Sequence, residues 1–211
     1  MDNLVDIGLN LMHSSFKKDR IEIIEEAINA LDPSIDFSQY DFNNDGIIDS
    51  VIFIYSIDYS ELDPWWAWVY LPEEEIILDN KELGYYMWAS YHFMFDELND
   101  DVFYNAETYI HEMGHLFGLN DYYHMDYDFG ALGGFGMMDH NVGDHGPLNK
   151  LLLGWVEPTV LSQGEHEITL DSYALYEEGR NQVLIIPKDY NNFDNTYGYD
   201  EYLVVMYYEP K

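Results

Sequence analysis

The chain has 211 residues, of which 47% are hydrophobic, and this suits one domain with a buried core and a small appended unit. Its 41 Asp and Glu residues against 8 Lys and Arg residues give a formal net charge of −33, which repels nucleic-acid phosphates and anionic membranes. This charge instead favours cations such as Ca²⁺ and basic peptides as partners. There is no Cys, which excludes disulfides and thiolate metal sites.

The first twenty residues do not have the pattern of a secretory signal peptide. Asp2 and Asp6 precede the apolar part, and Lys17, Lys18 and Arg20 follow it. No apolar run is long enough to span a membrane. We therefore expect either a cytoplasmic protein or a mature domain excised from a longer precursor. The sequence carries no signal for an oligomeric state.

An amphipathic helix is predicted over Asp19–Leu31. Its apolar residues recur at intervals of three and four, Asp19 can cap its start, and Asp32-Pro33 ends it. The apolar positions are Ile21, Ile24, Ala27, Ile28 and Leu31. We expect this helix to belong to the scaffold.

The segment Asp41–Asp49 has the pattern D-x-N-x-D-G-x-x-D. Its oxygen donors alternate around Gly46 as in the first part of a calcium-binding loop, but Ile52 stands where an EF-hand has its bidentate Glu. The donors are Asp41, Asn43, Asp45 and Asp49. The pattern predicts either a bound Ca²⁺ or a network of Asx turns, and both alternatives stay open. The following run Val51–Tyr55 is β-branched and aromatic and predicts a buried central strand.

Aromatic residues are concentrated between these elements and the middle of the chain. Trp65, Trp66 and Trp68 form a cluster that is typical of a core or a cleft wall. Leu83–Phe95 is rich in aromatic residues and Met and predicts one or two strands. An edge strand beside a hydrolase site could bind an extended peptide by strand addition, but the sequence does not say which strand does so.

The stretch HEMGHLFGLND, His111–Asp121, carries the strongest chemical signal. His111 and His115 are four residues apart, so on a helix predicted over Tyr104–Phe117 they share one face and can ligate one Zn²⁺. Glu112 is next to the first His in sequence. It cannot join the same ligand face, but it can reach a water in an open coordination position as a general base.

Gly118 and Asp121 extend this motif past the helix. Glycine takes φ > 0 without steric cost, so Gly118 permits a turn that brings Asp121 back as a third ligand. His124 is the main rival because imidazole is a better zinc ligand, although the spacing after Gly118 favours Asp121. Without a metal, these residues would be surface groups and a loop cap. The glycine-rich segment Tyr122–His145 holds further competing ligands: Asp126, Asp128, Asp139, His140, Asp144 and His145.

The C-terminal part predicts a short helix and then a small β unit. The helix is expected over Leu148–Val156, and three β-type runs beyond Pro158 predict antiparallel strands. These runs are Gly164–Leu170, Asn181–Pro187 and Tyr202–Tyr208. We expect an α/β (α+β) fold on a twisted mixed sheet, with one domain over residues 1–157 and the β unit over 158–211.

From about Ala30 to its C-terminus, the chain resembles the catalytic domain of the immune-inhibitor-A family of secreted bacterial metalloproteases, which are metzincin-like zinc peptidases. ALDPSIDFSQYDFNNDGIIDSVIFIY resembles the acidic, glycine-containing loop and core strand of that family. HEMGHLFGLNDYY matches its zinc motif, in which Asp replaces the third His of other metzincins. GGFGMMDHN resembles the methionine turn, and GPLNKLLLGWVEP resembles the segment that returns to a Gly-Trp pair.

The resemblance implies a role for each matching residue. It implies His111, His115 and Asp121 as zinc ligands, Glu112 as general base, and Met138 rather than Met137 as the turn methionine. It also implies a secreted protein with a peptide or protein substrate. His140 departs from the wider pattern, because many metzincins carry an oxyanion-stabilising Tyr at that position.

These observations together predict a zinc-dependent endopeptidase. Zn²⁺ would polarise the scissile carbonyl and activate water, and Glu112 would move the proton to the leaving amine. The alternative is a non-catalytic, peptidase-like adhesion module whose acidic loops hold Ca²⁺. Retention of Glu112 favours the enzyme, because a structural zinc site does not need this carboxylate.

Overall fold

The computed structural model describes residues 20–56, 66–72, 74–98, 101–124, 127–130, 132–172, 180–194 and 200–209. Contacts divide the chain into two compact units, and the division falls between Leu116 and Phe117. Both units combine helices with small mixed sheets, so the fold is mixed α/β, as predicted. The predicted functional boundary between residues 157 and 158 stays a prediction.

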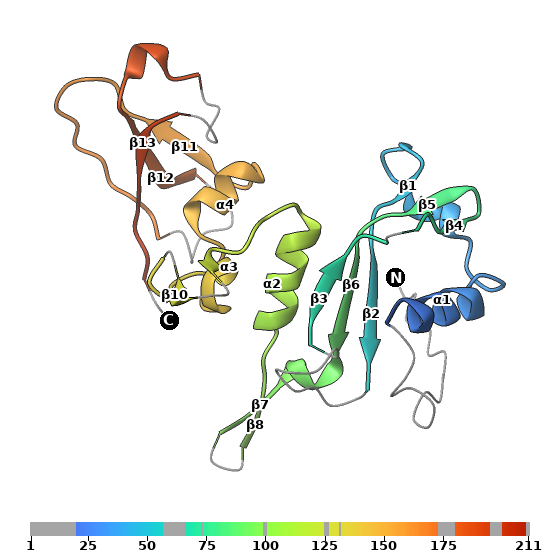
Figure 1. Cartoon of the computed structure of the whole chain (residues 1–211). Helices are drawn as coiled ribbons and strands as arrows, with labels where there is room; N and C mark the ends of the chain where they lie inside the picture. Colours follow the sequence, from blue (N-terminus) through green and yellow to red (C-terminus); the bar gives the residue numbers. More distant parts are fainter. Residues whose placement is uncertain are drawn as a thin grey trace. The chain divides into compact units, whose positions relative to one another are not determined.

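The first unit is built on a three-stranded sheet of order β2–β6–β3 (Figure 1). The middle strand β6 (Tyr86–Ser90) runs parallel to β2 (Val51–Tyr55) and antiparallel to β3 (Trp68–Tyr70). All five residues of β6 are buried. A strand that is buried on both faces needs a cover on each side of the sheet.

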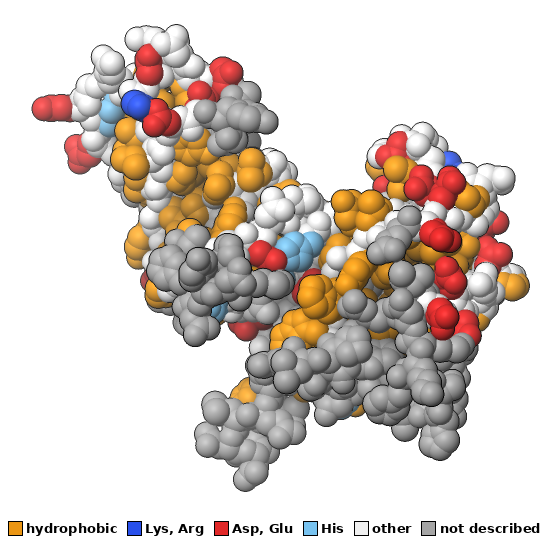
Figure 2. Space-filling view, viewed as in Figure 1, with side chains coloured by type: hydrophobic (Ala, Val, Ile, Leu, Met, Phe, Trp, Pro, Cys, Tyr) orange, Lys and Arg blue, Asp and Glu red, His pale blue; other side chains and the backbone are white. Residues whose placement is uncertain are grey.

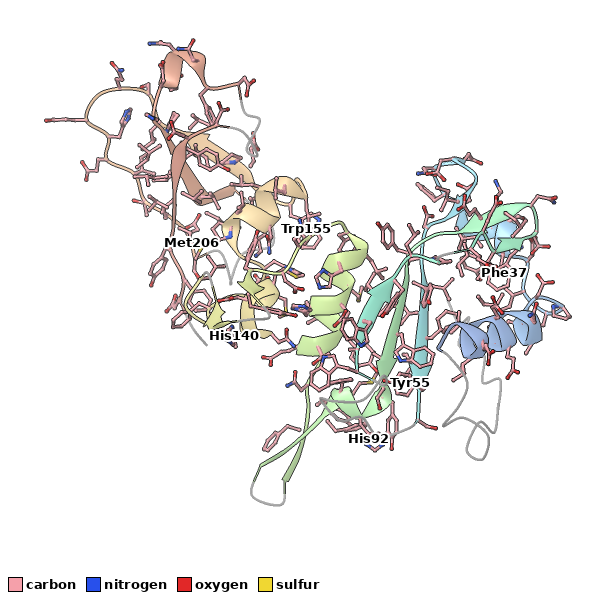
Figure 3. All side chains as sticks on the ribbon, viewed as in Figure 1. Phe37, Tyr55, His92, His140, Trp155 and Met206 are labelled. Atoms are coloured by element: carbon pink, nitrogen blue, oxygen red, sulfur yellow. The ribbon has the colours of Figure 1, made fainter. Side chains whose placement is uncertain are left out.

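Helices α1 (Arg20–Leu31) and α2 (Glu107–Leu116) provide these two covers. Ile24 and Ile28 of α1 share a core with Tyr86 and Trp88 of β6. Tyr109 of α2 shares a second core with the alternate residues Met87 and Ala89. Successive side chains of a strand point to opposite faces, so the two helices lie on opposite sides of β6. The core on the α1 side also includes Phe37 of η2 (Phe37–Tyr40), with Tyr55 packed against it (Figure 3).

The predicted helix over Asp19–Leu31 is confirmed to within one residue. The prediction for Val51–Tyr55 is correct in its bounds but wrong in making the strand central and buried. This strand is at the edge of the described sheet, and Ile52 and Ile54 are 41% and 47% exposed. The physical reason is that α2 packs mainly against β3 and β6, so none of the described helices covers the exposed face of β2.

Smaller elements connect this sheet to its surroundings. A second mixed sheet has the order β1 (Ile47–Ile48), β5 (Lys81–Leu83) and β4 (Ile77–Leu78). After β6, η3 (Tyr91–Met94) leads into a hairpin of β7 (Phe95–Leu98) and β8 (Asp101–Tyr104). The aromatic run Leu83–Phe95 therefore contains one complete strand, β6, and the ends of its neighbours. Trp65 lies outside the described residues, while Trp66 packs edge-on against Phe93 with ring centroids 5.1 Å apart, as expected of a core cluster.

The second unit starts with short elements and ends in a three-stranded sheet. Hairpin β9 (Tyr123–His124) and β10 (Tyr127–Gly130) precedes the helices α3 (Met137–His140) and α4 (Pro147–Leu152). The sheet contains β11 (Glu157–Val160), β12 (Arg180–Pro187) and β13 (Tyr202–Met206), with η4 (Tyr190–Asn192) between the last two strands. Val183 and Ile185 of β12 pack with Leu151 of α4 and Val156 in a third core.

The prediction of a wholly antiparallel C-terminal β unit is wrong. Strands β12 and β13 are antiparallel as expected, but β11 runs parallel to β12. Gly164–Leu170 forms no strand and instead belongs to the connection between β11 and β12. A parallel pair needs a long crossover, and the chain from Val160 to Arg180 supplies one.

The surface shows both the many acidic residues and the many hydrophobic residues of the sequence. On the face shown in Figure 2, acidic side chains gather over the part of the first unit that carries α1 and the β1–β5 sheet, whereas hydrophobic side chains gather over the C-terminal sheet. In the described part of the chain, no helix has both the length and the apolar character needed to cross a membrane.

Candidate metal centre

Helix α2 carries both histidines and has defined ends. The Asn105 side chain caps its start, because its Oδ1 accepts a hydrogen bond from the Glu107 N–H at 2.8 Å. The helix ends at Leu116, and Gly118 follows with φ of +85°. This left-handed conformation is the turn predicted for Gly118, and it favours glycine because a Cβ is strained there.

A buried tyrosine fixes α2 against the central strand. The Tyr109 hydroxyl donates a hydrogen bond to the Ser90 carbonyl oxygen at 2.8 Å, and both residues are buried. Burial raises the pKa of Tyr109 to about 12, so the phenol remains a donor throughout the neutral range. The rotation of α2 about its axis is therefore set by a bond two positions before His111.

His111 and His115 lie one above the other on α2. Their ring centroids are 4.9 Å apart, and the ring planes are nearly perpendicular, at 83°. His111 is 3% exposed and His115 is half-buried. Glu112, one position after His111, is also buried, at 6% exposure. The buried residues of α2 are therefore the ligand His111 and the carboxylate Glu112, together with Tyr109 and Gly114.

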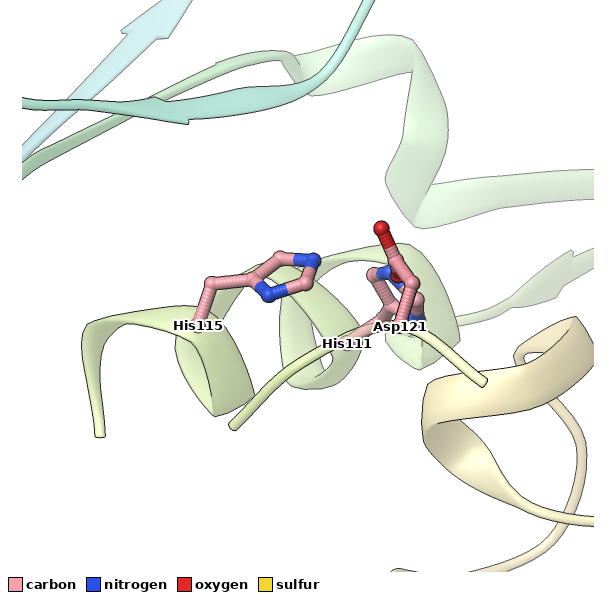
Figure 4. Close-up of side chains that lie close together, drawn as sticks. All are labelled: His111, His115 and Asp121. Atoms are coloured by element: carbon pink, nitrogen blue, oxygen red, sulfur yellow. The ribbon is translucent and has the colours of Figure 1, made fainter. Parts of the chain in front are cut away.

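The structure brings His111, His115 and Asp121 together. Each offers one ligand atom, and these atoms all lie within 4.8 Å of one another (Figure 4). The three residues could hold a metal ion, and they form the one such group found among the described residues. Two imidazole nitrogens and one carboxylate oxygen are a donor set that fits a divalent transition metal and leaves a coordination position open.

Of the rival ligands of the sequence, the four whose side chains the structure describes, Asp139, His140, Asp144 and His145, are not part of this group. The side chains of His124 and Asp128 and the whole of Asp126 lie outside the described residues. The His140 side chain (Figure 3) is 51% exposed, and its Nδ1 lies 3.6 Å from Asp139 Oδ1. The other carboxylate oxygen of Asp139 accepts a hydrogen bond from the Gly134 N–H at 2.8 Å. The remaining two residues have other neighbours: Asp144 pairs with Lys150, and His145 packs against Trp155 with centroids 5.6 Å apart.

The segment that contains Met137 and Met138 contacts Tyr122, the residue that follows Asp121. The Tyr122 N–H donates to the Met138 carbonyl oxygen at 2.8 Å, and the Tyr122 hydroxyl donates to Asn149 Oδ1. Burial and the nearby Tyr202 raise the pKa of Tyr122. Met137 and Met138 are both 1% exposed, and the chain enters α3 through Gly136 with φ of +120°. The choice of Met138 as turn methionine stays a prediction, but its carbonyl is the one bonded to Tyr122.

The acidic loop Asp41–Asp49 is held by hydrogen bonds of the Asx-turn type. The Asp41 carboxylate accepts from the N–H groups of Asp45 and Gly46, each at 3.0 Å, and from Lys81 Nζ at 2.5 Å. Lys81 is the main cause that lowers the pKa of Asp41. The other possible calcium ligands of the loop also accept hydrogen bonds. Asn43 Oδ1 and Asp45 Oδ1 accept from backbone N–H groups, and Asp49 Oδ2 accepts from the Phe42 N–H. A bound Ca²⁺ stays a prediction, and it would compete with the Lys81 ammonium group.

Comparison of the chain with models of protein families, with curated proteins and with solved structures found no match.

Sequence reasoning did not identify Tyr109, Tyr122 or Asn149 as supports of this centre. Tyr109 and Tyr122 flank the motif, but each partner lies far along the chain, and no spacing rule connects them. The one available signal was Asn149, a polar residue among the apolar residues of the predicted helix Leu148–Val156.

Proposed function

We propose that this chain is a zinc-dependent endopeptidase. The observation that carries the proposal is the convergence of His111, His115 and Asp121, with ligand atoms within 4.8 Å, around a motif that also supplies Glu112. The resemblance to immune-inhibitor-A metalloproteases supports the same activity and implies secretion, and both remain part of this proposal.

The residues have separate roles in the proposed reaction. His111, His115 and Asp121 would hold the ion, and Asp121 would lower its net charge relative to a site with three neutral histidines. When bound, Zn²⁺ supplies Lewis acidity toward a carbonyl oxygen and lowers the pKa of water. The Glu112 carboxylate would accept a proton from the attacking water and deliver it to the amine nitrogen of the leaving peptide.

The burial of Glu112 supports an enzyme rather than an adhesion module. Glu112 is 6% exposed, so its carboxylate is shielded from bulk water, which suits a general base that acts on one bound water molecule. A structural zinc site also tends to be closed by a fourth protein ligand, whereas the group found among the described residues has three.

Strand β3 is the best candidate for binding an extended substrate. It pairs with β6 on one side and has no partner on the other among the described strands, and α2 packs against both strands. A peptide that joined this edge would use main-chain hydrogen bonds for affinity and alternate side chains for specificity.

A quenched fluorogenic peptide library tests the function. We expect hydrolysis that a chelator abolishes and that Zn²⁺ restores, and we expect Glu112→Gln to lower turnover by at least about a hundredfold while zinc content is retained. The near-isosteric amide cannot accept a proton at neutral pH. Activity that survives in Glu112→Gln would contradict the role of this residue, and a zinc-loaded wild type that cleaves nothing would favour the adhesion alternative.

A further inference from the structure

Tyr122 is held at both its backbone and its side chain, and we propose that Tyr122 and Asn149 are positioning residues that hold Asp121 ready to bind a metal ion. This inference rests on the metal centre proposed above. It goes beyond the motif, because neither residue offers a ligand atom to the group of three.

The backbone bond acts directly on Asp121. The Tyr122 N–H, which donates to the Met138 carbonyl at 2.8 Å, belongs to the peptide group that also contains the Asp121 carbonyl. This peptide group is planar and includes the Asp121 Cα, so the bond fixes the plane from which the Asp121 side chain departs. Its acceptor belongs to a buried residue, because Met138 is 1% exposed.

The side-chain bond provides a second fixed point. The Tyr122 hydroxyl donates to Oδ1 of Asn149, a residue 27 positions further along the chain and 1% exposed. Asn149 lies in α4, where its neighbour Leu151 belongs to the third core and where the helix packs against β13. A phenol ring has only two side-chain torsions, so a fixed hydroxyl restricts the position of the Tyr122 Cα.

The burial of Asn149 supports a specific purpose for this bond. Among the described residues, the Asn149 Nδ2 group has no hydrogen-bond partner, so the bond from Tyr122 is the side-chain contact that compensates for burying the amide. A leucine would fill a similar volume without that cost. A buried Asn at position 149 is explained if its bond to Tyr122 helps to position the neighbouring residue Asp121.

Preorganisation connects these bonds to metal affinity. Gly118 has a left-handed conformation, and a Cβ added to it would meet no atom within 4 Å, so no close packing at Gly118 itself holds the chain that leads to Asp121. If the Tyr122 bonds are lost, Asp121 becomes ordered only when zinc binds, and the entropy lost in that ordering weakens zinc binding. Groups behind a metal ligand commonly change metal affinity by about 10–100-fold.

Zinc affinity measured by competition with a chromogenic chelator tests the proposal. We expect Tyr122→Phe and Asn149→Leu each to weaken zinc binding by about three- to tenfold, the loss of one hydrogen bond. The double variant should be no weaker than the more affected single variant, because both changes remove the same bond. Tyr190→Phe, which alters an exposed tyrosine of the same unit, should bind zinc within twofold of wild type.

The decisive arm repeats Tyr122→Phe in an Asp121→Ala background. If Tyr122 acts through Asp121, the change has no further effect on the residual affinity of the histidine pair. In the Co²⁺-loaded protein, Tyr122→Phe should also alter the visible d–d absorption, a signature of the ligand set that a general loss of stability does not change. If Tyr122→Phe does not fold by circular dichroism, Asn149→Leu carries the same comparison.

Three outcomes would overturn the proposal. Zinc affinity of Tyr122→Phe and Asn149→Leu within twofold of wild type would show that the bonds are only structural. An equal loss in the Asp121→Ala background would show that Tyr122 acts by another route. A wild-type chain that binds no zinc would overturn the metal centre itself, and that result is distinguished from the other two because it appears before any variant is made.

Discussion

The hydroxyl of Tyr109 and the carbonyl oxygen of Ser90 are joined by a buried hydrogen bond of 2.8 Å, which links the ligand-bearing helix α2 to the central strand β6. Ser90 is the last residue of β6, and the four residues before it are all apolar or aromatic. The bond therefore sits where the apolar core of the sheet ends and the polar motif of α2 begins.

Tyr109→Phe should lower the free energy of unfolding by about 1 kcal/mol, the net value of one buried hydrogen bond. Chemical denaturation monitored by tryptophan fluorescence measures this difference. Tyr104→Phe is the matched control, since Tyr104 is 90% exposed and a surface change of this kind should alter stability by less than about 0.5 kcal/mol. Equal effects of the two variants would contradict the role given to the Ser90 bond.

The same pair predicts a dependence on alkaline pH. Burial raises the pKa of Tyr109 to about 12 in the folded protein from its ordinary value of 10.0, so the phenol of the unfolded chain ionises first. The stability that depends on a neutral phenol is complete below pH 10 and is lost as pH rises through 12. The stability of wild type should therefore fall more steeply than that of Tyr109→Phe between pH 10 and 12, and parallel curves would refute the assignment.

Acid should act on the first unit through Asp41. Lys81 and two backbone N–H groups lower the pKa of Asp41, so this carboxylate contributes stability above its unfolded value of 3.8. That contribution is lost as pH falls from 3.8 through the lower folded value. Asp41→Asn should destabilise the protein at pH 7 and give a flatter stability profile below pH 4. Asp32→Asn, an exposed carboxylate, is the control and should follow the wild-type profile.

Calcium binding at the Asp41–Asp49 loop can be measured apart from zinc binding, because only the calcium site would compete with the Lys81 ammonium group. Lys81 Nζ already lies 2.5 Å from Asp41 Oδ2, so a cation at this loop has to displace an ammonium group. If Ca²⁺ binds, Lys81→Met should increase the shift in thermal midpoint between excess Ca²⁺ and a chelator, with zinc held constant. An unchanged midpoint in both proteins would leave the Asx-turn network as the whole account of the loop.

The third ligand can be tested by comparing Asp121 with His124. Asp121→Ala should weaken zinc binding by at least about a hundredfold, because two imidazoles would remain from the protein, whereas Asp121→His should retain binding. His124→Ala should leave affinity within twofold of wild type. Zinc content after dialysis against graded chelator measures all three, and an empty site in His124→Ala beside a full site in Asp121→Ala would reverse the assignment.

Gly118 should tolerate no ordinary side chain without strain. A Cβ there would meet no atom within 4 Å, so the cost of Gly118→Ala is conformational and amounts to about 1 kcal/mol for a φ of +85°. Gly118→Asn should lose less, because Asn enters the left-handed region more readily than Ala. Thermal unfolding of the metal-free proteins ranks the two, and a more stable alanine variant would contradict the explanation.

The motif was readable because its geometry is local. His111 and His115 are related by helical periodicity alone, and Gly118 needs only its own backbone to make the turn that precedes Asp121. The group of three could therefore be predicted from the eleven consecutive residues His111–Asp121. The start of the helix could not: the sequence predicts it at Tyr104, but Tyr104 ends strand β8 and α2 begins at Glu107.

Long-range pairing set the limit of prediction. Val51–Tyr55 has the more apolar pattern, yet Tyr86–Ser90 is central, because the choice depends on which strand α1 and α2 both cover. Strand β11 contains Pro158 and lacks a strand signal, and its parallel partner β12 supplies the order that its own sequence does not. The bond between Tyr122 and Asn149 likewise exists only after α4 has folded.

The parallel pairing of β2 with β6 has a consequence for how the first unit assembles. Neither hairpin nor helix can bring these strands together locally, so the chain from Tyr55 to Tyr86 must close before the pair forms, and such non-local contacts slow folding. Until then, β6 presents apolar side chains and leaves the peptide groups of its β2 edge unpaired. Refolding should therefore compete with aggregation, and the recovered yield should fall steeply as the protein concentration during refolding rises.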